Sequence, residues 1–239
     1  ELKKILGLAS GKKYTDLTSL RYGSIMIMTD QDVDGSHIKG LVFNMFHSLW
    51  PSLVTCNSFI SSMMTPIVKA SKGNLVVSFY NLSDFDDWKN NNEYKKWNIK
   101  YYKGLGTSTE DEAIEYFTHM KTVDYQYQKE QSDESLDLAF NKKRADERKE
   151  WLSGYDRKNV LSFKDSRVSY TDFINKDLIH FSNYDNIRSI PNVCDGLKPS
   201  QRKILYSAFK RNLTSEIKVA QFAGYVSEHA GYHHGEASL

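Results

Sequence analysis

The sequence predicts an α/β protein that continues into a mostly helical segment. Short apolar runs alternate with polar turns in the first part of the chain, which is typical of strands buried in a parallel sheet, whereas apolar residues near the C-terminus recur at helical spacing. The 239 residues, 40% of them hydrophobic, can form a sizeable core and one or two domains. We expect an α/β domain with flanking helices over residues 1–150, a connector over 151–171 and the helical segment over 172–239.

The first predicted strand is the uninterrupted apolar run at 25–28, which leads into the sequence Asp30-Gln31-Asp32-Val33-Asp34-Gly35. Alternate residues of an extended chain point the same way, so Asp30, Asp32 and Asp34 share one side if the chain stays extended. Gly35 then permits a sharp turn, and Ser36 caps the helix that follows. The apolar stripe expected on that helix consists of Ile38, Leu41, Val42, Met45, Phe46 and Leu49.

The three aspartates are the strongest candidates for a functional site. Carboxylates this close repel one another, and a divalent cation removes that cost. Mg²⁺ uses one or two carboxylates together with water or phosphate oxygens, which indicates a site that faces a phosphodiester. Two alternatives remain open. An EF-hand loop starting at Asp30 would need a bidentate glutamate where Leu41 stands, and the aspartates could simply form a solvated acidic turn.

The next elements continue the α/β pattern. Strands are expected at 59–68, 75–80 and 97–102, and the asparagine-rich tract at 83–96 is expected to be an exposed loop. Residues 121–135 are polar and are expected to form a second loop. Residues 136–152 predict a highly charged helix at the end of the first domain.

The sequence Lys103-Gly104-Leu105-Gly106 connects the last of these strands to a helix. Thr107 with Glu110, or Thr109 with Glu112, has the spacing of a capping box at the start of that helix. We expect the two glycines to serve a plain strand-to-helix turn, while Lys103 could reach a phosphate or the acidic cluster.

The C-terminal segment predicts two helices around a turn. Pro199 is suited to the first turn of a helix, and Gly231 to the end of the second. The apolar residues expected to be buried are Ile204, Leu205, Ala208 and Phe209 on the first helix and Val219, Phe222, Ala223 and Val226 on the second. Basic residues dominate from 198 to 218, which favours a helix-turn-helix module that contacts DNA, although a solvated basic face has the same composition.

Charge and cysteine content narrow the protein class. The formal net charge is +2, so the distribution of basic residues is more informative than their sum. Cys56 and Cys194 are far apart and lack metal-type spacing, which predicts a reducing compartment and no zinc site. No apolar run approaches the roughly 20 residues of a membrane span, so we expect no membrane association.

Several motifs carry a family resemblance. The acidic segment with Ser36-His37-Ile38-Lys39-Gly40-Leu41, the sequence Tyr102-Lys103-Gly104-Leu105-Gly106-Thr107-Ser108 and the sequence Tyr232-His233-His234-Gly235-Glu236 closely resemble type IIA DNA topoisomerases of the eukaryotic kind. Further blocks at 142–151, 172–176, 186–191 and 195–199 occur in the family's order, and together they span nearly the whole chain.

The resemblance implies a Toprim domain, which has a Rossmann-like parallel sheet with flanking helices, followed by the N-terminal part of a winged-helix domain. The Toprim part would lack its N-terminal strand. The resemblance further implies an ATP-dependent homodimeric enzyme of the nucleus that breaks and reseals both strands of a DNA duplex for strand passage. Asp30, Asp32 and Asp34 would hold one or two Mg²⁺ ions. ATP would serve the whole enzyme without binding to this part of it.

The resemblance also assigns contacts with double-stranded DNA. The residues expected at the DNA are Lys142, Lys143, Arg188, Lys198, Arg202, Lys203, His233, His234 and Ser238. Each has an ordinary alternative: a solvated lysine pair, arginines in structural salt bridges and polar histidines without a ligand. Ser238 is included because it would lie on the same face as His234 if a helix began there.

Two catalytic groups of the family are not found in this sequence. The family's nucleophilic tyrosine would lie beyond Leu239, and the glutamate of its Glu-Gly-Asp motif would lie before Glu1. Arg21-Tyr22 precedes the first strand and is in the wrong place for the nucleophile. We therefore expect a central part of a larger enzyme that has no activity by itself. A non-catalytic DNA-binding module or another Toprim enzyme, such as a primase or a nuclease, are the alternatives.

Overall fold

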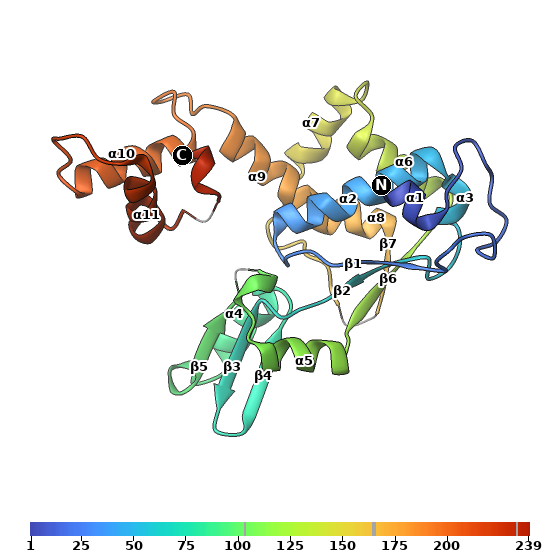
Figure 1. The fold of residues 1–239 in the computed structure, drawn as a ribbon, viewed down its shortest axis with the longest axis horizontal. Coiled ribbons are helices and arrows are strands. Elements are labelled where there is room, and N and C mark those ends of the chain that lie inside the picture. The colour runs from blue at the N-terminus through green and yellow to red at the C-terminus, as the bar shows by residue number, and fades with distance from the viewer. Residues whose placement is uncertain (103, 164–165, 233) are drawn as a thin grey trace. The chain divides into compact units, whose positions relative to one another are not determined.

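The computed structural model describes residues 1–102, 104–163, 166–232 and 234–239 (Figure 1). These residues form two compact units, Glu1–Phe181 and Ser182–Leu239. The first unit is mixed α/β and the second is helical, which confirms the predicted fold class. No helix in the described ranges is both long enough and apolar enough to span a membrane.

A four-stranded sheet forms the centre of the first unit. Its strands, in spatial order, are β1 (Ile25–Ile27), β2 (Ile60–Met63), β6 (Thr122–Gln126) and β7 (Arg167–Ser169). The β1–β2 and β6–β7 pairs are parallel, whereas β2 and β6 are antiparallel. The sheet is therefore mixed, and β7 belongs to it although its residues lie in the predicted connector.

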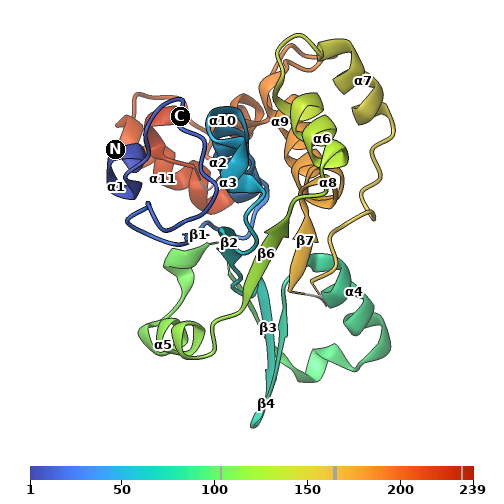
Figure 2. The ribbon, with the colours of Figure 1, turned by 90° about the vertical axis from the view of Figure 1, so that its right-hand side faces the viewer.

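A second, three-stranded sheet extends from the same unit as a long hairpin with one added strand (Figure 2). It consists of β4 (Leu75–Phe79), β3 (Val68–Lys72) and β5 (Asn98–Tyr101), all antiparallel. The expected single strand at 59–68 is thus divided between the two sheets, and the other two predicted strands are confirmed. The small core of this sheet consists of Val68, Ala70, Phe79 and Phe85.

The asparagine-rich tract forms a helix where a loop was expected. The helix α4 (Leu82–Asn91) begins after Asn81, whose side-chain oxygen accepts a hydrogen bond from the Asp84 backbone N–H at 2.7 Å. Phe85 is buried from this helix against Phe79. One buried aromatic residue and a good cap are sufficient for a helix that is otherwise polar. A 3₁₀ turn, η1 (Tyr94–Lys96), then leads into β5.

Helices cover one face of the four-stranded sheet (Figure 1). They are α2 (Val33–Leu49), α3 (Pro51–Val54), α6 (Glu130–Phe140), α8 (Tyr170–Phe173) and the π-helical turn η3 (Ile174–Leu178). Phe43 of α2 contacts the rings of Tyr125, Tyr170 and Phe173, with centroids 4.4–5.1 Å apart. The main core of the unit is therefore an aromatic cluster between helix and sheet. The remaining helical elements are α1 (Leu2–Leu6), η2 (Leu105–Thr107), α5 (Glu110–Thr118) and α7 (Ala145–Ser153).

The region 121–152 differs from its prediction. The expected loop contains β6, in which Val123 and Tyr125 alternate with polar residues and are buried. The expected single helix is two helices, because the chain turns at 141–144 between α6 and α7. Leu136 is completely buried on α6, so an amphipathic face extends further towards the N-terminus than the charge pattern indicated.

The second unit contains both predicted helices. α10 (Pro199–Lys210) begins at Pro199, and α11 (Val219–Ala230) ends at Gly231, which has a left-handed φ of 59°. The other elements are η4 (Glu236–Ser238) and the C-terminal part of α9 (Ile179–Ser189), which crosses the boundary between the units.

The stripes on these two helices are only partly buried. Ala223 and Val226 are buried on α11, as predicted, but Val219 is 74% exposed. On α10, Leu205 is exposed and Phe209 is 77% exposed, so the expected burial of that stripe is wrong within the described unit.

Candidate functional site

The acidic segment lies at the carboxyl end of β1, but it does not continue as an extended strand. α2 already begins at Val33, with Asp32 as its N-cap residue. The Asp32 carboxylate accepts a hydrogen bond from the Gly35 backbone N–H at 2.7 Å through Oδ1. Ser36 therefore does not cap the helix, because the Asp32 carboxylate satisfies the free N–H group and also interacts favourably with the helix dipole. Asp34 lies in the first helical turn, so the three aspartates do not share one side of a strand.

Gly35 is required by close packing instead of by a turn. It lies inside α2, and a Cβ atom at this position would stand 2.0 Å from the backbone oxygen of Asp30. A side chain at Gly35 would therefore push the acidic turn away from the helix.

The buried face of α2 is also different from the predicted stripe. Ile38, Leu41 and Leu49 are 48–55% exposed. Lys39, Phe43 and Phe46 are buried at i, i+4 and i+7, together with Ser36 and Gly40. Hydrophobicity alone thus selected the wrong face, because a lysine and two small residues occupy the inner one.

A second loop meets the acidic turn. The Leu105 backbone N–H donates a hydrogen bond to Asp30 Oδ1 at 2.7 Å, across 75 residues of sequence. A Cβ atom on Gly104 would stand 2.6–2.7 Å from the same carboxylate group. The predicted Thr109–Glu112 capping box of α5 is present directly after this loop. Lys103, which was also expected near the site, lies outside the described residues.

The chemistry of Asp30 and Asp32 fits a magnesium ion. Both side chains are exposed, and each has one oxygen held by a backbone N–H. Within the described residues, Oδ2 of each carboxylate accepts no hydrogen bond. Mg²⁺ needs only one or two carboxylates besides water and phosphate oxygens. No cluster of three or more His, Cys, Asp or Glu residues in the described ranges is arranged to hold a metal ion, so the fit concerns these two oxygens.

A buried ion pair supports the start of α2. Lys39 Nζ lies 3.3 Å from Asp177 Oδ2 on η3, and Ser36 Oγ donates to Asp177 Oδ1 at 2.7 Å. Burial by itself would lower the pKa of the Lys39 ammonium, but the Asp177 carboxylate outweighs it and raises the pKa above its ordinary value. Sequence reasoning missed both residues. The available signal was the spacing of Lys39 with Phe43 and Phe46.

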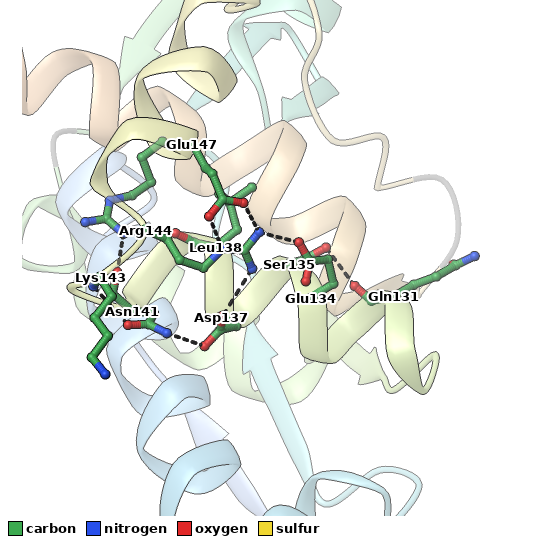
Figure 3. A network of polar contacts seen from close by, with 10 residues as sticks. Gln131, Glu134, Ser135, Asp137, Leu138, Asn141, Lys143, Arg144 and Glu147 are labelled. Atoms are coloured by element: carbon green, nitrogen blue, oxygen red, sulfur yellow. Dashed lines mark hydrogen bonds and ion pairs between the residues drawn. The ribbon is translucent and has the colours of Figure 1, made fainter.

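Lys142 and Lys143 are exposed at the turn between α6 and α7. Arg144 holds this turn through Glu134, Asp137 and Glu147, at 3.1 Å between Nη1 and Asp137 Oδ2 and 2.9 Å between Nε and Glu147 Oε1 (Figure 3). In Figure 3 the Lys143 side chain points away from these carboxylates. The two predicted lysines thus lie together on a braced turn.

Asn141 and Arg148 brace the backbone of the same turn. The Asn141 side chain bonds Asp137 at 3.0 Å and accepts from the Lys143 N–H at 3.0 Å. Arg148 donates to the carbonyl oxygens of Leu138 and Asn141. The turn is therefore fixed by side chains from both helices.

Three predicted basic residues of the second unit have partners within it. Arg202 forms two-point contacts with Asp195 at 2.8–3.0 Å, and Lys203 Nζ donates to the Gly231 carbonyl oxygen at 3.0 Å. Arg188 lies 3.2 Å from Asp185. The Lys198 backbone N–H bonds Gln201 at the start of α10, and its ammonium has no ion pair in the described part of the chain.

The last predicted residues are only partly covered by the structure. His233 lies outside the described residues, and the His234 ring is 5.4 Å from the Tyr232 ring. The short helix η4 begins at Glu236 instead of near His234. Ser238 Oγ bonds the Tyr232 hydroxyl and, at 2.7 Å, the Gly235 carbonyl oxygen.

Comparisons with known proteins agree with this architecture. Residues 63–186 match the family model of the C-terminal associated domain of TOPRIM, and residues 188–239 match the family model of DNA gyrase/topoisomerase IV. DNA topoisomerase 2 of Plasmodium falciparum is 50% identical over 240 residues, which cover 99% of this chain. The chain belongs to the DNA topoisomerase 2 family. DNA topoisomerase 2 of Arabidopsis thaliana, a second member, is 52% identical over 244 residues.

A solved structure of the family has the same fold. The crystal structure of the Plasmodium falciparum topoisomerase II DNA-binding, cleavage and re-ligation domain matches with a TM-score of 0.85 and 50% identity. The match covers 99% of this chain and 33% of that one. This chain spans 17% of the length of each of these two curated DNA topoisomerase 2 relatives.

Proposed function

We propose that the whole protein is an ATP-dependent type II DNA topoisomerase. It makes and reseals a Mg²⁺-dependent double-strand break through which a second duplex passes. The support is family membership together with two half-committed carboxylates, Asp30 and Asp32, at the carboxyl end of a buried strand. As a whole, the enzyme is proposed to act as a homodimer in the nucleus, and its ATP is bound outside this chain.

Asp30 and Asp32 are proposed to hold one or two Mg²⁺ ions, with Asp34 as support. The Leu105 and Gly35 N–H groups keep Oδ1 of each carboxylate in place, so that Oδ2 can face the ion. A bound Mg²⁺ stabilises negative charge on the oxygens of the reacting phosphodiester.

The basic residues are proposed to bind the backbone of double-stranded DNA. Lys142, Lys143 and Lys198 are exposed or partly exposed without ion pairs in the described ranges, so they can reach phosphates directly. Arg188, Arg202 and Lys203 would contact DNA by exchanging or sharing their present partners, and His233, His234 and Ser238 complete the proposed surface. Such contacts position DNA without reading its sequence.

The test is the double substitution Asp30→Asn and Asp32→Asn in the full-length enzyme. Both asparagines still accept the two N–H hydrogen bonds, so the fold is preserved while the negative charge is lost. We expect Mg²⁺-dependent DNA cleavage to fall at least about 100-fold, as for loss of a strong electrostatic contribution to the transition state. Asp111→Asn, an exposed aspartate in the first turn of α5, is the matched control and should cleave normally.

A non-catalytic DNA-binding module is the second candidate function. It is favoured by one observation: both carboxylates already have structural hydrogen bonds, to Gly35 and Leu105. This alternative predicts undiminished cleavage in the double variant and DNA affinity that does not change when EDTA replaces Mg²⁺.

A further inference from the structure

The loop that contains Gly104 and Leu105 has no conformational need for glycine at its first position. Gly104 has a φ of 175° and a ψ of −179°, an extended conformation that any residue can adopt. What excludes a side chain is the Asp30 carboxylate, 2.6–2.7 Å from the position of a Cβ atom. The expectation of a plain strand-to-helix turn therefore misses the contact that explains this glycine.

We propose that the Gly104–Leu105 peptide is a positioning element for Asp30 in cation binding. This inference rests on the proposed function. Gly104 lets the loop approach, and the Leu105 N–H holds Oδ1 at 2.7 Å. The carboxylate is then oriented with Oδ2 directed to the cation. Hydrogen-bond partners of metal-ligating carboxylates act in this way when they fix the orientation of the ligand.

The donor is held rigidly on both sides. On the strand side, the Tyr102 backbone N–H bonds the Ile67 carbonyl oxygen at 3.0 Å, and the Tyr102 hydroxyl bonds Glu112. On the helix side, Thr107 donates from its backbone N–H and its hydroxyl to the Gly104 carbonyl oxygen, at 3.1 and 2.7 Å. The Leu105 N–H is thus presented by a loop tied to β5 and η2.

Glu112 is the centre of these ties. Burial raises its pKa, but hydrogen bonds from Lys100, Tyr102 and the Thr109 N–H outweigh burial and lower the pKa of Glu112 to about 2. The carboxylate therefore stays charged at neutral pH and keeps both ends of the loop in place. The loop contacts Asp30 as a preformed element, so little ordering is needed when a cation binds.

The decisive experiment compares Leu105→Pro with Leu105→Ala in the full-length enzyme. Proline removes the N–H group, and it is tolerated here because Leu105 is the first residue of a 3₁₀ turn and Gly104 before it is extended. Alanine loses the side chain but keeps the donor. Mg²⁺ affinity is measured by calorimetry without nucleotide, after subtraction of the heat from the Asp30→Asn/Asp32→Asn enzyme, and DNA cleavage is measured against Mg²⁺ concentration.

We expect Leu105→Pro to bind Mg²⁺ about tenfold more weakly than Leu105→Ala. The Mg²⁺ concentration for half-maximal cleavage should rise by the same factor, with the maximal cleavage restored at high Mg²⁺. A second pair, Gly104→Ala against Gly106→Ala, tests the approach of the loop, because a Cβ atom on Gly106 meets nothing within 4 Å. Only Gly104→Ala should weaken Mg²⁺ binding, and the metal-free melting temperatures show that each variant folds.

Two results would overturn the proposal, and they differ in what else they affect. Equal Mg²⁺ affinity in Leu105→Pro and Leu105→Ala would refute the positioning role and leave the proposed function intact. If the unsubstituted enzyme shows no Mg²⁺ uptake beyond the Asp30→Asn/Asp32→Asn enzyme, then the proposed function fails and this inference fails with it.

Discussion

Two ion-pair clusters in the first unit brace two different candidate contact points. The buried cluster joins Lys39 to Asp177, with side chains 8% and 20% exposed, and supports the start of α2 beside the acidic turn. The solvent-facing cluster joins Arg144 to three carboxylates that are 48–65% exposed, and supports the turn that carries Lys142 and Lys143. The acidic turn is thus braced from the interior and the basic turn from the surface.

This difference in burial determines what each cluster contributes. A buried charge without its partner is strongly destabilising, whereas water screens pairs between exposed groups. We infer that the Lys39–Asp177 pair is important for global stability, while the Arg144 network mainly fixes local geometry. Three substitutions test this inference.

The largest effect is expected for Asp177→Asn. The substitution leaves the Lys39 ammonium buried without a counter-charge, so the free energy of unfolding should fall by about 3 kcal/mol, near the low end for a broken buried pair because Asp177 is partly exposed. Chemical denaturation of a soluble form of the protein measures this value. Lys39→Met with Asp177→Leu removes both charges and should recover most of the loss. If the single and double variants are equally unstable, packing and not charge explains the site.

A smaller effect is expected for Arg144→Ala. The melting temperature should fall by less than for Asp177→Asn, and the loss should shrink as salt is added, because the partner carboxylates face solvent. Lys149→Ala, which breaks an isolated exposed pair with Asp146, is the control and should have almost no effect.

The pH dependence of the Arg144→Ala difference gives an independent check. Hydrogen bonds from Arg144 hold the pKa of Glu147 below its ordinary 4.5, and bonds from Asn141 and Arg144 hold the pKa of Asp137 below its ordinary 3.8. A lowered pKa in the folded state contributes stability above the ordinary value that is lost as the pH falls through the lowered one. The melting-temperature difference between wild type and Arg144→Ala should therefore decrease on acidification below about pH 4.5. A difference that stays constant down to about pH 2 would contradict the charge-based explanation.

The smallest effect on stability is expected for Lys142→Ala with Lys143→Ala. Neither side chain has an ion pair in the described residues, so the melting temperature should not change. The slope of log affinity for duplex DNA against log salt should become shallower by about 1.8, as for two lost phosphate contacts. Lys12→Ala with Lys13→Ala, two exposed lysines near the N-terminus, serves as the matched control. An unchanged slope would show that the braced turn does not touch DNA.

Local patterns in the sequence were sufficient for much of the fold. Pro199 and Gly231 marked a helix start and a helix end, and Thr109 with Glu112 marked a capping box, because these signals depend on residues only a few positions apart. The acidic motif was located in the same way. Its detailed geometry was not, since Asp32 caps a helix that starts earlier than the apolar pattern indicated.

By itself, the sequence determined the fold class, most element positions and the family, because apolar periodicity, caps and motifs are local properties of the chain. Only the tertiary structure decided which face of α2 is buried, that β7 pairs with β6, and that Leu105 meets Asp30. The physical reason is that such contacts join residues up to 141 positions apart, as between Ser36 and Asp177. Their energies depend on packing and desolvation in three dimensions, which no short window of sequence contains.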